Sequence, residues 1–210
     1  MASLYTTLAA GLIFPLHERL KHHDTVAVRK HMEGAQWWSP ERLEAFQLQR
    51  LRALLTNAQQ HVPYYRELSA KLGCKAEDIR SLGDLKCLPF LTKPIIRQNL
   101  EQLKSGQAQG LARFNTGGSS GEPLIFFIGR ERVSHDVAAK WRATRWWGVD
   151  IGDPEIVVWG SPVELTAQDR IRQMRDRLLR TQLLPAFEMS EANLDGFVAT
   201  IRRTRPTMLF

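Results

Sequence analysis

The chain has 210 residues, of which 43% are hydrophobic and 24% are charged. These fractions are ordinary for a folded globular protein and exclude an intrinsically disordered chain. The net charge of +7 suits an anionic partner, such as a nucleotide, a nucleic acid or an acidic membrane surface, and does not choose among them.

The first sixteen residues carry no charged side chain. They differ from a secretory signal because a basic start and a small-residue cleavage site are missing, and they are too short to span a bilayer as a helix. Leucines recur at every fourth position, which predicts a helix with an apolar stripe: Leu4, Leu8, Leu12 and Leu16. We expect an amphipathic helix that docks onto the protein, with weak peripheral membrane contact as the alternative and no transmembrane segment.

The histidines and cysteines give no metal site. His17, His22, His23 and His31 have no cysteine or paired carboxylate beside them, so we expect surface histidines and no metal ligands in this chain. Cys74 and Cys87 form neither a CxxC motif nor a disulfide framework. We therefore expect two small, unpaired hydrophobic side chains and a cytoplasmic location, where thiols stay reduced.

Residues 1–105 are predicted to be mostly helical. Ser39-Pro40 combines an N-cap residue with a proline in the first turn, and an apolar stripe follows at helical spacing until Pro63. The stripe consists of Leu43, Phe46, Leu51, Leu54 and Ala58. Thr92 and Pro94 predict a second, short helix by the same logic.

Residues 106–210 alternate between strand and helix patterns. The expected strands are 124–128, 156–159, 183–187 and 207–210, and the expected helices are 131–147, 166–181 and 190–204. Strands that alternate with helices predict βαβ units and a parallel sheet, hence the α/β class, with Pro185 confining its strand to an edge. Because the sequence ends inside an apolar strand, we expect the α/β region to be truncated at its C-terminus. The helix at 166–181 carries several arginines without interleaved aromatic residues, so we expect a solvated face and no nucleic-acid partner.

One loop has the composition of an anion-binding site. Residues 116–123 read Thr-Gly-Gly-Ser-Ser-Gly-Glu-Pro, directly before a predicted strand. Glycines let the backbone approach a ligand closely, and successive N–H groups together with hydroxyls can surround a phosphate. The loop lacks the Gly-Lys-Ser/Thr of a Walker A motif, and a strand follows it where a dinucleotide fingerprint has a helix. The candidate phosphate-binding residues are Thr116, Gly117, Gly118, Ser119, Ser120 and Gly121.

This loop resembles the phosphate-binding signature of the adenylate-forming, acyl-CoA synthetase superfamily. The segments 61–66, 88–93 and 97–99 resemble, in order and spacing, the N-terminal region of phenylacetate-CoA ligase-like proteins, a group with members associated with capsular polysaccharide biosynthesis. The resemblance runs from about residue 40 to the end. It implies a helical region at 1–105, followed at 106–210 by an incomplete nucleotide-binding region of the same large domain.

The resemblance implies an enzyme that binds ATP with magnesium, activates a small carboxylic acid as an acyl-adenylate and passes the acyl group to coenzyme A or another thiol. It also places the adenine contacts, the metal-binding acidic residue and the catalytic lysine beyond Phe210. No catalytic residue is therefore assigned here, and the 210-residue chain alone is expected to be inactive.

A second hypothesis is a non-catalytic relative that serves as a scaffold or accessory protein in polysaccharide biosynthesis. It is favoured by Glu122, which stands where the superfamily commonly has lysine before the proline. A third hypothesis, a basic RNA-binding protein, predicts salt-dependent binding to oligonucleotides. The acyl substrate, the thiol acceptor and the oligomeric state are not indicated by the sequence.

Overall fold

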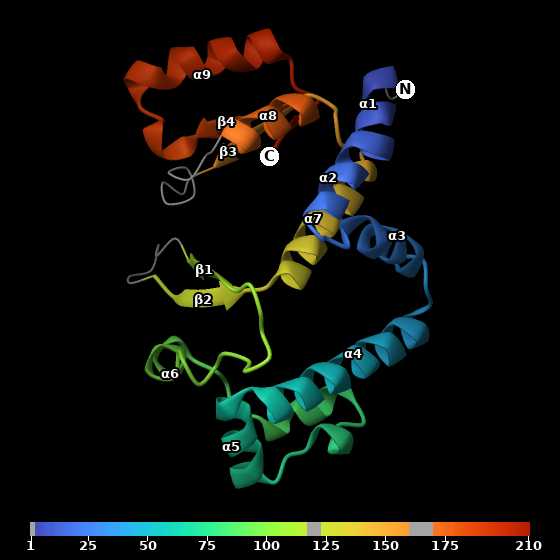
Figure 1. The fold of residues 1–210 in the computed structure, drawn as a ribbon, viewed down its shortest axis with the longest axis vertical. Helices are drawn as coiled ribbons and strands as arrows, with labels where there is room; N and C mark the ends of the chain where they lie inside the picture. The colour runs from blue at the N-terminus through green and yellow to red at the C-terminus, as the bar shows by residue number, and fades with distance from the viewer. Residues whose placement is uncertain (1–2, 117–122, 160–169) are drawn as a thin grey trace. The chain divides into compact units, whose positions relative to one another are not determined.

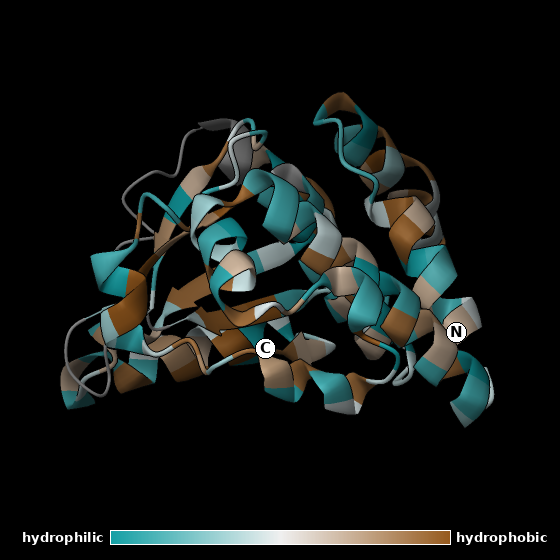
Figure 2. Ribbon diagram, turned by 90° about the horizontal axis from the view of Figure 1, so that it is seen from below, coloured by the Kyte–Doolittle hydropathy of each residue, from teal (hydrophilic) through white to brown (hydrophobic). Residues whose placement is uncertain are grey.

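A computed structural model describes residues 3–116, 123–159 and 170–210, without the side chains of Arg130 and residues 170–173. The chain divides into two compact units, one made of Met1–Met32 and Ser134–Phe210 and the other of Glu33–Val133. Figure 1 shows the elements of both units, and Figure 2 shows apolar and polar segments alternating along the helices, as expected where each helix buries one face. Within the described residues, no helix is both long enough and apolar enough to cross a membrane.

The first unit begins with one continuous helical segment. It consists of α1 (Leu4–Leu8), the π-helical turn η1 (Ala9–Ile13) and α2 (Phe14–Leu20), and α3 (Thr25–Ala35) follows. Ser3 caps the segment, because its hydroxyl accepts a hydrogen bond from the Thr6 amide at 3.0 Å. The sequence thus predicted the helix correctly.

The face that this helix buries differs from the predicted one. Its buried residues are Thr6, Ala9, Phe14 and Glu18, whereas the leucine stripe is exposed. The Thr6 hydroxyl donates to the Asp153 carboxylate at 2.7 Å, and Ala9 lies against Gly152. The helix is therefore docked through Phe14 together with small and polar side chains, and the expectation that the leucines form its packing face was wrong.

Trp141 is the buried centre of this unit. It lies on α7 (Arg130–Arg145), is 3% exposed, and donates its indole N–H to the Asp150 carboxylate. The Phe14 ring meets it edge-on with centroids 5.0 Å apart, and the Arg29 guanidinium lies over it at 4.3 Å. These contacts bury Trp141 between α7 and the N-terminal helices, and α2 runs alongside α7 (Figure 1).

The same unit contains a three-stranded parallel sheet. Its strands are β3 (Glu155–Trp159), β4 (Thr181–Pro185) and β5 (Met208–Leu209), in the order β4-β3-β5. The helices α8 (Arg170–Leu179) and α9 (Glu191–Thr204) connect them, with a 3₁₀ turn η5 (Ala186–Glu188) after β4. The α/β class is confirmed, and β4 lies at an edge as its proline requires.

The second unit is helical before its hairpin. Its helices are α4 (Pro40–His61), α5 (Pro63–Leu72), the 3₁₀ turns η2 (Ala76–Asp78) and η3 (Leu82–Cys87), and α6 (Lys93–Gln98); the hairpin strands are β1 (Ala112–Asn115) and β2 (Ile125–Ile128). The α4 cap at Ser39 is confirmed. Leu55 and Ile79 are buried in its core cluster, whereas Leu54, predicted for the stripe, is 65% exposed.

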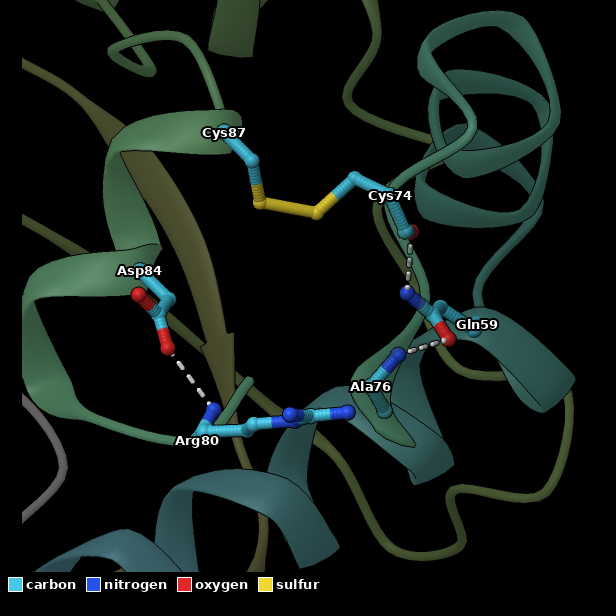
Figure 3. Close-up of a disulfide and its surroundings, with 6 residues drawn as sticks. All are labelled: Gln59, Cys74, Ala76, Arg80, Asp84 and Cys87. Atoms are coloured by element: carbon cyan, nitrogen blue, oxygen red, sulfur yellow. Dashed lines mark hydrogen bonds between the residues drawn. A yellow bond between two sulfur atoms is a disulfide. The ribbon is translucent and has the colours of Figure 1, made fainter. Parts of the chain in front are cut away.

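The two cysteines are joined, which corrects the expectation of free thiols. Cys74 and Cys87 form a disulfide with their Cα atoms 6.2 Å apart (Figure 3). Gln59 of α4 holds the segment that carries Cys74. Its side-chain NH₂ donates to the Cys74 carbonyl at 3.0 Å, and its side-chain oxygen accepts from the Ala76 amide at 3.1 Å. The spacing in the sequence did not indicate the pair, because α4 and η2 bring the two positions together through tertiary packing.

Around the disulfide, Asp84 supports the turn that carries Cys87. Its carboxylate accepts hydrogen bonds of 2.8 Å from the amides of Arg80 and Ser81. These bonds lower the pKa of Asp84 below its usual value, with the Arg80 amide as the largest cause.

Gly152→Ala is expected to destabilise the protein by about 3 kcal/mol. Gly152 has φ +95°, and a Cβ there would collide with the side chain of Ala9. The matched control is Gly196→Ala in α9, where a Cβ meets nothing within 4 Å and helix propensity predicts a gain of up to about 1 kcal/mol. Urea unfolding of both variants measures the difference, and equal free energies of unfolding would contradict the docked N-terminal helix.

The double substitution Cys74→Ser and Cys87→Ser is expected to lower the free energy of unfolding by about 3 kcal/mol, because the disulfide closes a short loop in the unfolded chain. The cysteines are 13 residues apart. Thiol titration of the denatured, unreduced protein should find no free thiol. Two titratable thiols in freshly purified protein, with unchanged stability of the double variant, would show that the pair is not bonded in solution.

Candidate functional site

The predicted phosphate loop lies at the tip of the β1–β2 hairpin. The strands are antiparallel, with Asn115 opposite Ile125. Beyond this pair, the Thr116 amide donates to the Leu124 carbonyl at 3.0 Å, and the Leu124 amide donates to the Thr116 hydroxyl at 3.0 Å. Two hydrogen bonds thus close the base of the loop and hold its two ends together.

Of the predicted site residues, the structure places Thr116. The others lie outside the described residues, as does Glu122: Gly117, Gly118, Ser119, Ser120 and Gly121. Their contact with phosphate stays a prediction.

Thr116 has a more specific role than the sequence indicated. Its amide is already bonded to the Leu124 carbonyl and does not point to a ligand. Its hydroxyl oxygen accepts from the Leu124 amide, which leaves the hydroxyl proton to donate elsewhere. Thr116 therefore closes the hairpin and can contribute at most its hydroxyl to an anion.

The hairpin has one aromatic face and one face with cations. Phe114 and Phe126 are opposite each other and stack with ring centroids 6.2 Å apart. On the other face Arg113 is opposite Phe127, and the Lys104 ammonium lies 4.1 Å from the Phe127 ring centroid. Two cations therefore accompany the strands that carry the loop.

Sequence reasoning missed β1 and, with it, the placement of Arg113 and Lys104. The alternation of polar and apolar residues in Ala112–Asn115 was a usable signal, since period two indicates a strand with one buried face. Lys104 had no such signal, because it reaches the hairpin from the preceding segment and also pairs with Glu101 at 2.7 Å.

The segment that leads into β1 is tied to the junction between α4 and α5. The Gly106 amide donates to the His61 carbonyl at 2.8 Å, and the Tyr64 amide donates to the Gln102 carbonyl at 3.1 Å. Burial, and then the neighbouring Tyr64, raise the pKa of the Tyr65 phenol, so Tyr65 is neutral at physiological pH. The residues at 61–66 thus act as a fixed support for the chain that enters the hairpin.

A separate cavity of about 450 Å³ lies in the first unit, lined by Phe14, Val137, Trp141 and Phe210 among others. Its charged groups form pairs within the protein, such as Lys140 with Glu155 and Arg175 with Asp176. Its apolar lining and these pairs give no indication of a phosphate site.

A metal centre is not formed by the residues that the structure places. Among them, no group of three or more His, Cys, Asp or Glu side chains could hold an ion. Glu18 is instead a buried carboxylate bonded to His17, His23 and Thr25. Burial is the main cause that lowers the pKa of His17 below its usual value, so its neutral form is favoured.

Comparison by sequence finds phenylacetate-coenzyme A ligases and a protein named CapK among the relatives of this chain. The chain is 32% identical over 89 residues to the phenylacetate-coenzyme A ligase of Escherichia coli (strain K12) and 27% identical over 124 residues to that of Aromatoleum evansii. These matches cover 41% and 58% of this chain. It is also 21% identical over 164 residues to Protein CapK of Staphylococcus aureus, which covers 78% of this chain. No family model matches.

Solved structures agree on the fold. The 2-hydroxyisobutyryl-CoA ligase in complex with 2-HIB-AMP, in the postadenylation state, matches 81% of this chain with a TM-score of 0.62 and 19% identity. The same ligase with 2-HIB-AMP and CoA matches with a TM-score of 0.55. The chain is similar to adenylate-forming CoA ligases over part of its length.

The CoA-ligase similarity covers only a portion of each longer protein. The matches span 36% of Protein CapK and 36% of the solved ligase. They span 20% of the Escherichia coli phenylacetate-coenzyme A ligase and 28% of the Aromatoleum evansii one. The predicted resemblance to CoA ligases is therefore confirmed as a similarity over part of the chain.

In the β1–β2 hairpin, Thr116→Val is expected to cost about 1 kcal/mol of folding free energy, because the Leu124 amide loses its acceptor. Hydrogen exchange should show faster exchange of the Leu124 amide in Thr116→Val and near-normal protection in Thr116→Ser, which keeps the hydroxyl. Unchanged protection in the valine variant would mean that the hydroxyl does not close the loop.

Proposed function

We propose that this chain forms the phosphate-binding part of an ATP-dependent ligase that activates a small carboxylic acid as an acyl-adenylate for transfer to coenzyme A or another thiol. The observation that carries the proposal is the pair of hydrogen bonds between Thr116 and Leu124, which join the two ends of the Gly/Ser loop. This loop has the sequence that resembles the superfamily's phosphate signature. The similarity to CoA ligases in sequence and fold supports it.

The proposed reaction has two steps. A carboxylate oxygen attacks the α-phosphorus of ATP, the bond to the β-phosphate oxygen breaks, and pyrophosphate leaves. The thiolate then attacks the acyl carbon, and AMP leaves. Chemistry of this kind depends on positioning and on stabilising the charge that builds up on the leaving group.

The hairpin contributes to the first step. Amides of Gly117, Gly118 and Gly121 would bind the β- and γ-phosphates, with hydroxyls from Thr116, Ser119 and Ser120. Holding both ends of the loop at fixed distance lowers the entropy that the loop loses when it wraps a phosphate. Arg113 on β1 adds a positive field that favours the approach of an anion, whereas the charge of Lys104 is largely offset by Glu101.

Magnesium would supply further neutralisation of the phosphates when bound. The residues that the structure places contain no group fit to hold it, and the resemblance puts its acidic ligand beyond this chain. For the same reason we propose that residues 1–210 alone do not catalyse the reaction.

The alternative is a non-catalytic relative that serves as a scaffold or accessory protein in polysaccharide biosynthesis. Glu122 favours it, because a carboxylate replaces the lysine that commonly precedes the proline. At a separation of 4 Å in water, the sign change from lysine to glutamate amounts to about 2 kcal/mol against phosphate binding.

ATP binding by the full-length protein separates the two functions. In isothermal titration, the ligase hypothesis predicts ATP binding that Gly118→Asp weakens about tenfold or more, since a carboxylate in the loop would repel the phosphates. Gly34→Asp is the matched control, because a side chain there meets nothing within 4 Å. Glu122→Lys should strengthen ATP binding by up to about thirtyfold, the equivalent of about 2 kcal/mol.

Pyrophosphate exchange with a panel of carboxylic acids completes the test. The full-length protein should exchange and the 210-residue chain should not. Full-length protein that neither binds ATP nor exchanges pyrophosphate would support the accessory role. Robust exchange by the 210-residue chain would refute the proposal that residues 1–210 alone do not catalyse the reaction.

A further inference from the structure

The N-terminal helical segment presents a row of leucines to solvent. The exposed fractions are 91% for Leu4, 48% for Leu8, 59% for Leu12, 55% for Leu16 and 73% for Leu20. Single exposed leucines are ordinary on protein surfaces, but a contiguous apolar row on one helix marks an interaction surface.

The segment cannot bury this row by rolling on the protein. Its inner face is fixed by the Thr6–Asp153 hydrogen bond and by a 2.7 Å hydrogen bond from the Tyr5 hydroxyl to the Leu178 carbonyl. Ala9 lies against Gly152, where even one added carbon would collide. The leucines therefore remain outside while these contacts hold.

The π-helical turn keeps the leucines in one row. In a regular α-helix, residues four apart are offset by about 40°, so the row from Leu4 to Leu20 would wind through about 160°. A π turn inserts one extra residue, so the side chains that follow it are rotated back about the helix axis by about 100°. With η1 at Ala9–Ile13, the net offset is about 60°, and one surface can contact all five side chains.

The charges on this surface have one sign. From Ser3 to His22 the only acidic residue is Glu18, which is 4% exposed and bonded to two histidines. Arg19 and Lys21 are exposed at the end of the row. An apolar row with cations at one end and no exposed acid complements an anionic lipid surface.

We propose that residues 4–21 form a membrane-contact surface that lies in the interface of an anionic bilayer, with the leucines in the acyl boundary and Arg19 and Lys21 at the headgroups. A second copy of the chain fits the same surface less well. Leucines spaced by four do not give the paired positions of a coiled-coil heptad, and a parallel pair of helices would bring like charges together.

The test is co-sedimentation of the 210-residue chain with vesicles of phosphatidylcholine alone and with 30% phosphatidylglycerol, at about 0.1 M salt. We expect binding to the anionic vesicles and much weaker binding to the neutral ones. Leu12→Gln with Leu16→Gln should weaken binding about tenfold or more, because two apolar side chains no longer partition into lipid.

The matched control is Leu54→Gln with Leu72→Gln, which removes two leucines of similar exposure, 65% and 45%, from α4 and α5. This control should bind within about twofold of the unchanged chain. A second pair, Leu4→Gln with Leu20→Gln, tests the ends of the row, and Arg19→Gln with Lys21→Gln should weaken binding to anionic vesicles about fivefold or more. Circular dichroism verifies that each variant is folded.

Three outcomes would overturn the proposal. The first is no binding to either vesicle. The second is binding by the Leu12→Gln, Leu16→Gln variant that equals binding by the Leu54→Gln, Leu72→Gln control, which would show that the leucine row is not the contact with lipid. The third is a dimer in light scattering that the stripe variant dissociates, without vesicle binding, which would assign the surface to a second copy of the chain.

Discussion

The buried indole of Trp141 is the contact on which the first unit depends. It joins segments that are far apart in sequence, because Phe14, Arg29 and Asp150 all meet the same ring system. An indole needs a hydrogen-bond acceptor when it is buried, and Asp150 supplies one from the turn that precedes β3. The N-terminal helix is thereby packed against α7, and the face that it turns to solvent is fixed as a consequence.

Elements with local causes were predictable from the sequence. Ser39 with Pro40, Thr92 with Pro94 and the β-branched run at 156–158 indicate their helices and strand through capping and side-chain shape, and the structure contains each of them. The edge position of β4 followed from a proline that cannot donate a hydrogen bond. These features depend on interactions within a few residues.

Features with tertiary causes were not predictable in the same way. The leucine row has the helical period, but the period does not indicate which face of the helix packs against the protein. The face with Ala9 is the buried one, because Gly152 leaves room for the Ala9 side chain. The disulfide depends on α4 bringing Gln59 next to the Cys74 segment, which spacing alone does not encode. The phosphate loop at 116–121 was predicted from composition, because glycine and hydroxyl residues have local chemical meaning, and it stays a prediction, while the strand β1 that precedes it was missed.

The effect of Glu122 on phosphate binding depends on the other groups of the hairpin as well as on the lysine that it replaces. A single carboxylate near a phosphate costs on the order of 1 kcal/mol in water, which is less than the binding that several converging amides can provide. Arg113 lies on the Phe127 face of the hairpin and contributes charge of the opposite sign. The backbone of a Gly-rich loop does not depend on its side chains for these amides, so the loss of one lysine contact lowers affinity without removing the site. The proposed ligase function is therefore compatible with Glu122, since the hydrogen bonds between Thr116 and Leu124 hold the two ends of the loop together.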